Sequence, residues 1–189
     1  NTDRPRSVYI ATYGCQMNAR DSEVIYGLLE KEGYELAKSP EIADVILFNT
    51  CSVRQNAEDR VWSQFGRFKN KLIGVIGCMA QNYKEAIFKR APRVDFVVGP
   101  ADIDKIPEII KRLMHFKDEI ASSSAYGGVP RNDKLLKDGD SSLFQRKIWE
   151  TEGLNRPEEI YHTGFYEDKE RAYVVISEGC SNFCSYCVV

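Results

Sequence analysis

The sequence lacks long apolar runs: none approaches the roughly 20 residues that a membrane-spanning helix needs, and the first residues show no signal-peptide pattern. It also lacks a charge of one dominant sign, because 26 Lys and Arg oppose 28 Asp and Glu and leave a net charge of −2. Proteins that bind nucleic acid over a broad surface are usually basic, so any such binding requires a local patch. We therefore expect a cytoplasmic protein with no membrane partner.

Histidine is scarce too, since the chain has only His115 and His162 against six cysteines. Neither histidine stands at ligand spacing to the cysteines at the end of the chain, so zinc there would need a distant fourth ligand. Three disulfides are disfavoured in a reducing cytosol, and a chain of 189 residues can bury a core without them. Zinc, a redox dithiol and disulfides remain the alternatives to another use of these thiols.

Half of the cysteines form a C-x-x-x-C-x-x-C array at Cys180, Cys184 and Cys187. Three thiolates at this spacing, with no fourth nearby, suit an iron–sulfur cluster in which one iron stays open to a ligand. The array follows residues 172–176, an apolar and β-branched run that predicts a buried strand. The cysteines would then lie in the loop at the carboxyl end of that strand.

The first part of the chain alternates apolar strands with amphipathic helices, which predicts an α/β fold with a parallel sheet and helices on both faces. The expected strands are 7–12, 34–37, 43–49, 72–76 and 94–98. The expected helices are one capped by Asn18 or Asp21 and ending before Gly33, then 56–69, 82–90 and 103–116. A flavodoxin-like order, 2-1-3-4-5, fits this succession of elements.

The other three cysteines, Cys15, Cys51 and Cys78, each follow one of these strands. In the flavodoxin-like order, the strands concerned are the first, third and fourth, and these are neighbours in the sheet. Ligands of such sheets bind beyond the carboxyl ends of the strands. We therefore expect the three thiols to converge on a second cluster; the alternative is that each is an ordinary small buried residue.

Residues 117–170 have the composition of a linker, rich in serine, glycine and charged residues. One short apolar pattern interrupts it, and we expect it to form a docking helix without chemistry of its own. Its apolar residues are Leu143, Phe144, Ile148 and Trp149.

Five motifs of the chain point to a known family. They are Gly14–Asn18, Asn49–Arg54, Gly77–Gln81, Val98–Pro100 and Glu178–Cys187. Together they resemble the radical S-adenosylmethionine methylthiotransferases, over residues 7 to about 113 and 171 to 189. Within that family, the chain is most similar to the members that convert isopentenyladenosine beside the tRNA anticodon to its 2-methylthio derivative. This similarity lies in the residues that follow the first two cysteines, Gln16–Met17 and Ser52–Arg54.

The resemblance implies two [4Fe–4S] clusters, with S-adenosylmethionine as co-substrate. Cys180, Cys184 and Cys187 would ligate the cluster that chelates S-adenosylmethionine, whereas the trio at 15, 51 and 78 would hold an auxiliary cluster. The implied partners are the tRNA anticodon loop and a cytosolic electron donor such as flavodoxin, with the enzyme acting as a monomer.

The resemblance also divides the chain into an auxiliary-cluster domain at 1–116, a linker at 117–170, and the truncated start of the radical domain at 171–189, whose first strand would begin a partial barrel. On this basis the chain alone is an inactive fragment of the enzyme. Two rival functions stay open. One is methylthiolation of threonylcarbamoyladenosine or of a ribosomal-protein aspartate, and the other is a non-catalytic iron–sulfur module for electron transfer.

Overall fold

A computed structural model describes residues 6–52, 55–123, 147–153, 156–158, 160, 165, 169–170, 172–176 and 185. The elements run β1 (Ser7–Tyr13), α1 (Gln16–Lys31), β2 (Glu35–Leu36), β3 (Val45–Thr50), α2 (Gln55–Gln64), β4 (Leu72–Gly77), α3 (Cys78–Tyr83), α4 (Ala86–Arg90), β5 (Phe96–Val98), the 3-10 helix η1 (Pro100–Lys105), α5 (Ile106–Ser123) and β6 (Ile148–Glu150). The predicted α/β class and the alternation of strands with helices are confirmed.

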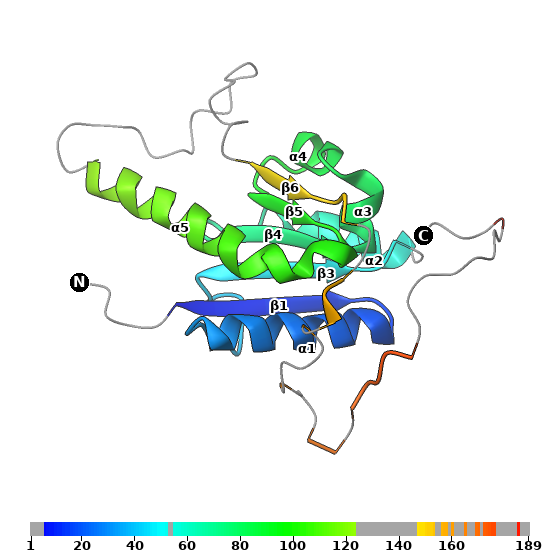
Figure 1. Ribbon diagram of the computed structural model, residues 1–189. Helices are drawn as coiled ribbons and strands as arrows, with labels where there is room; N and C mark the ends of the chain where they lie inside the picture. Colours follow the sequence, from blue (N-terminus) through cyan, green and yellow to red (C-terminus); the bar gives the residue numbers. More distant parts are fainter. Residues whose placement is uncertain are drawn as a thin grey trace.

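All strand pairs of the sheet are parallel, in the order β2-β1-β3-β4-β5-β6. The predicted flavodoxin-like order of the first five strands is therefore confirmed. Every residue of β3 and β4 is buried, as expected for central strands covered on both faces. The sheet forms the middle layer of the molecule (Figure 1).

Two separate apolar cores lie on the two faces of this sheet. One core takes residues from α1 and α5, such as Ile25 and Ile110, together with Val8 of β1. The other takes residues from α2, α3 and α4, such as Val61, Met79 and Ile87. Figure 1 shows the same division, with α1 and α5 on the near side and α2, α3 and α4 behind the sheet. The sheet is therefore covered by helices on both faces, as the sequence predicts.

The starts of two helices differ from prediction in a way that matters for the cysteines. The first helix begins at Gln16 with Cys15 as its N-cap, so the predicted cap at Asn18 or Asp21 was wrong. The helix expected at 82–90 is in fact two: α3 begins at Cys78 itself, and a break at Lys84, where φ is 47°, separates it from α4. Two of the three cysteines therefore sit at helix N-termini.

A sixth strand was not predicted. Ile148 and Trp149 belong to β6, which pairs with β5, so a docking helix over these two residues was wrong; Leu143 and Phe144 lie outside the described residues. Without β6, β5 would leave its backbone groups unpaired at the edge of the sheet, and pairing satisfies them. In the same part of the chain, α5 runs to Ser123 rather than ending at 116.

The strand predicted at residues 172–176 is also wrong, because this segment has no regular secondary structure. Two of its apolar side chains face solvent, with Val174 78% and Ile176 93% exposed. A strand forms only when another strand accepts its backbone hydrogen bonds, and no described residue does so for this segment.

Candidate metal centre

The register of the sheet brings three cysteines to one edge. Tyr13, Thr50 and Gly77, the last residues of β1, β3 and β4, lie opposite one another in neighbouring strands. Cys51 and Cys78 come directly after the second and third of these residues, and the N–H of Cys51 donates to the carbonyl of Tyr13 at 2.9 Å. The predicted convergence of the three cysteine loops on the carboxyl edge of the sheet is thus what the backbone produces.

Cys15 is held by the start of α1. Its backbone N–H donates to Oδ1 of Asn18 at 3.1 Å, and its thiol contacts the same oxygen at 3.4 Å. This is a capping box, in which the side chain at the third helical position satisfies the backbone of the N-cap residue. Gly14 is required beside it, because a Cβ there would lie 2.1 Å from Asn18 Oδ1. The thiol itself is exposed and accessible to a ligand.

Cys78 is less exposed than Cys15, and the other two thiols affect the pKa of its side chain. Burial is the main cause that raises the pKa of the Cys78 thiol. Negative charge on Cys51, Cys15 or Asp21 raises this pKa further, which places these groups within electrostatic range of one sulfur. The backbone N–H of Ser52 acts the other way, since a hydrogen bond to the sulfur stabilises the thiolate. Metal binding deprotonates such thiols and adds cationic charge that offsets the burial.

A polar network that the sequence did not predict supports the second loop. The hydroxyl of Ser52 donates to the buried carboxylate of Glu58 at 2.5 Å and accepts from Asn82 Nδ2 at 3.1 Å. The hydroxyl of Tyr83 donates to the other oxygen of Glu58 at 2.8 Å. This bond raises the pKa of Tyr83, because the carboxylate favours the protonated phenol. The network ties the residue after Cys51 to α2 and α3.

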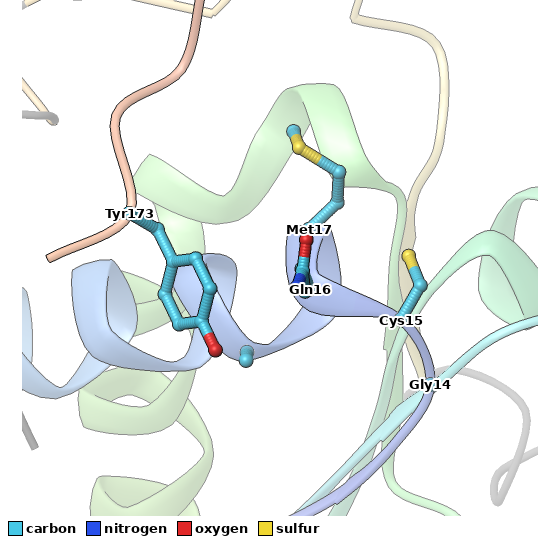
Figure 2. A pocket seen from close by; sticks show the side chains of 6 residues that line it. Gly14, Cys15, Gln16, Met17 and Tyr173 are labelled. Atoms are coloured by element: carbon cyan, nitrogen blue, oxygen red, sulfur yellow. The ribbon is translucent and has the colours of Figure 1, made fainter. Parts of the chain in front are cut away.

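An open pocket lies next to the first cysteine. It has a volume of about 610 Å³ and is lined by Gly14, Cys15, Gln16, Met17, Ala19 and Tyr173. Tyr173 comes from the segment that precedes the terminal cysteine array, and Figure 2 shows its ring across from the first turn of α1, with Cys15 on the opposite side of Gln16 and Met17.

The chain returns over α1 after β6 and is anchored there. Arg156 makes two hydrogen bonds to the carboxylate of Asp21, at 2.6 and 3.1 Å, and both side chains are nearly buried. Ile160 reaches the core on the same face, and the ring of Phe165 lies 5.4 Å from that of Tyr26. Residues separated by more than a hundred positions thus hold the returning segment close to the cysteine edge.

The donor set at the edge consists of three free cysteines, a residue type that holds iron–sulfur clusters through its thiolates. Among the residues that the structure describes, no three or more His, Cys, Asp or Glu side chains are grouped closely enough to hold one metal ion. A cubane cluster binds each thiolate through a different iron, and three thiols on adjacent loops have the chemistry that such a cluster requires. The hydroxyl of Thr50, which precedes Cys51, is buried without a hydrogen-bond partner among the described groups, as expected beside a site that a cluster would complete.

The second predicted trio, Cys180, Cys184 and Cys187, lies outside the described residues. In the part of the chain that the structure does describe, no helix is both long enough and apolar enough to cross a membrane.

The chain is similar to proteins that are already known. Residues 7–99 match the model of the "Uncharacterized protein family UPF0004". Three relatives carry the name tRNA-2-methylthio-N(6)-dimethylallyladenosine synthase. The chain is 39% identical to the protein of Rhodopirellula baltica over 97% of its length, 40% identical to that of Alkalilimnicola ehrlichii over 96%, and 36% identical to that of Thermosipho melanesiensis over 97%.

The chain spans 36–37% of the length of these three relatives. The family match covers β1 to β5 and all three cysteine loops at the carboxyl edge, whereas the similarity to the relatives continues through β6 and the returning segment. Residues 7–99 thus match the UPF0004 family model, and the chain is similar to the named tRNA-2-methylthio-N(6)-dimethylallyladenosine synthases over nearly its whole length.

Proposed function

We propose that the chain is the cluster-binding part of a tRNA methylthiotransferase, which converts isopentenyladenosine beside the anticodon to its 2-methylthio derivative. The observation that carries this proposal is the convergence of three cysteine loops at one sheet edge. The names of the relatives support the choice of reaction and substrate.

Each cysteine trio has its own part in this proposal. Cys15, Cys51 and Cys78 hold an auxiliary [4Fe–4S] cluster, and Cys180, Cys184 and Cys187 hold a second one. With S-adenosylmethionine as co-substrate, the second cluster supplies the radical chemistry that an unactivated adenine C–H bond requires, because such a bond has no acidic proton for a general base.

The residues around the pocket have a substrate-binding part in the proposal. An anticodon-loop base is recognised outside its stack, by aromatic stacking and contacts to its edges. Tyr173 offers a ring, the exposed thioether of Met17 offers a soft apolar surface for an isopentenyl group, and Gln16 offers an amide. A base in this pocket would lie beside the thiol of Cys15.

The remaining features of the enzyme follow from the same proposal. The partners are the anticodon loop of tRNA and a cytosolic electron donor such as flavodoxin, and the protein acts as a cytoplasmic monomer. The auxiliary-cluster domain takes residues 1–116 together with the end of α5 and with β6, which lie within the connection at 117–170, and the radical domain begins at 171.

Anaerobic reconstitution tests the two-cluster proposal directly. The chain should bind about eight irons, and Cys15→Ala, Cys51→Ala, Cys78→Ala or Cys180→Ala should each lower the count to about four and spare the other electron paramagnetic resonance signal. Met17→Leu, a matched change next to a ligand, should leave both signals intact. About four irons in the parent chain, or zinc in place of iron, would contradict the proposal.

Two assays separate the proposal from its rivals. In a strain that lacks the gene, liquid chromatography with mass spectrometry should find isopentenyladenosine without its methylthio group in tRNA, whereas an unchanged nucleoside would indicate another target. A non-catalytic electron-transfer module would show clusters but no turnover of S-adenosylmethionine by the complete protein.

A further inference from the structure

Asn49 is a fully buried polar residue in an otherwise apolar strand. It is 0% exposed and lies in β3, two residues before Cys51. Because β3 runs between β1 and β4, the end of this strand lies between the two neighbouring cysteine loops. A buried side-chain amide must satisfy two donors and one acceptor, so its neighbours are tightly specified.

The amide of Asn49 binds the start of α1, directly after Cys15, through three hydrogen bonds. Its Oδ1 accepts from Asn18 Nδ2 at 2.9 Å, and its Nδ2 donates to the backbone carbonyl of Asn18 at 2.7 Å and to Ser22 Oγ at 2.9 Å. Since Asn18 Nδ2 points to Asn49, Asn18 Oδ1 points to the backbone of Cys15. The orientation of one amide thereby sets the orientation of the other, and with it the place of the first thiol.

The same amide touches the third cysteine loop. A Cβ added to Gly77 would lie 2.6 Å from Oδ1 of Asn49, and Gly77 adopts a φ of +88° immediately before Cys78. Only a glycine lets the backbone pass this close to the amide. Asn49 therefore borders all three loops: the first by hydrogen bonds, the second by chain connection and the third by direct contact.

We infer that Asn49 is a positioning residue that sets the separations of the thiols of Cys15, Cys51 and Cys78 for the auxiliary cluster. This inference rests on the proposed function, because it assigns the residue to the cluster site. Residues that orient metal ligands without touching the metal commonly change metal affinity by about 10- to 100-fold when they are replaced.

The test uses the chain in which the second trio is replaced (C180A/C184A/C187A), so that only the auxiliary cluster binds. Asn49→Leu keeps the volume but removes every hydrogen bond, and Asn49→Asp keeps the acceptor but loses both donors. The matched control is Asp44→Asn, because Asp44 accepts from the backbone of Ser7 at 2.9 Å at the other end of the same two strands. Each chain is reconstituted, and its cluster is challenged with an iron chelator.

We expect Asn49→Leu and Asn49→Asp to release iron about 10- to 100-fold more readily than their parent, with an altered electron paramagnetic resonance spectrum in the reduced cluster that remains. Asp44→Asn should stay within about twofold of the parent, with an unchanged spectrum. If Asn49→Leu does not fold, Asn49→Asp carries the comparison.

Two results would overturn the inference without overturning the cluster site. In the first, both Asn49 variants retain as much iron as the parent and show the same spectrum. In the second, Asp44→Asn loses as much iron as the Asn49 variants do. In the second case the loss would reflect weaker folding rather than thiol placement. A parent chain that binds no cluster would overturn the cluster site itself, and this inference with it.

Discussion

The ion pair between Arg156 and Asp21 should be a main anchor of the returning segment on α1. Its two parallel hydrogen bonds have the bidentate geometry that makes arginine–carboxylate pairs strong. The side chains are only 9% and 7% exposed. Burial makes the pair costly to break, because removal of one partner deprives the other buried charge of both hydrogen bonds.

The expected loss follows from this geometry. Removing one partner of a buried pair costs about 3–5 kcal/mol, and we take about 3 because both groups keep a small contact with solvent. At about 2–4 °C per kcal/mol for a chain of this size, Arg156→Met or Asp21→Asn should lower the Tm by about 6–12 °C. The double variant should lose less than the sum of the two, with a coupling energy above about 1 kcal/mol.

The measurement is a double-mutant cycle by urea and thermal unfolding of the apo chain. Arg6 and Asp118 provide an exposed control, because they also form an arginine–aspartate ion pair, through one hydrogen bond and with side chains 34% and 65% exposed. Asp118→Asn should therefore change the free energy of unfolding by less than about 1 kcal/mol. Single losses below about 1 kcal/mol at the buried pair, or purely additive effects, would refute the reasoning.

Two further predictions concern backbone and proton positions near the site. Gly77→Ala should destabilise the apo chain by about 3 kcal/mol or more in thermal unfolding, because φ of +88° is strained and the new Cβ meets the amide of Asn49, whereas Gly33→Ala, at φ of +81° in open space, should cost about 1 kcal/mol. Glu58→Gln should lower the raised pKa of Tyr83 toward its ordinary value in an ultraviolet titration read against Tyr83→Phe. Because this folded-state pKa is raised, the bond stabilises the fold below the unfolded pKa of about 10, and the gain is lost as pH rises through the folded value. Equal losses at the two glycines, or an unmoved titration, would contradict these predictions.

Most of the sheet could be predicted from the sequence because its central strands are short, apolar and separated by helical periodicity. The runs in β3 and β4 are buried on both faces, so their pattern is continuous and their place in the order follows from the crossover rule. The convergence of the three cysteine loops then follows from topology alone. Helix starts were less predictable, since Cys15 is an N-cap whose partner Asn18 acts from inside the helix.

β6 and the returning segment could not be predicted, because their stabilising contacts are remote in sequence. β6 is only three residues long and is a strand because β5 offers it an edge. The opposite error occurred at 172–176, where a strongly β-prone run stays exposed without a partner strand among the described residues. In both cases the partner, rather than the propensity, decides the conformation.

The supporting residues of the site did leave a signal in the sequence, although its meaning needed the structure. β3 is apolar except for its last two residues, Asn49 and Thr50, which are fully buried. Burial of these polar groups costs desolvation free energy that apolar side chains would not cost. For Asn49, the hydrogen bonds to Asn18, near Cys15, offset this cost. The hydroxyl of Thr50, beside Cys51, has no hydrogen-bond partner among the described groups. Polar residues at the carboxyl end of a buried strand, directly before a cysteine, thus mark the sheet edge at which the cluster is proposed to bind.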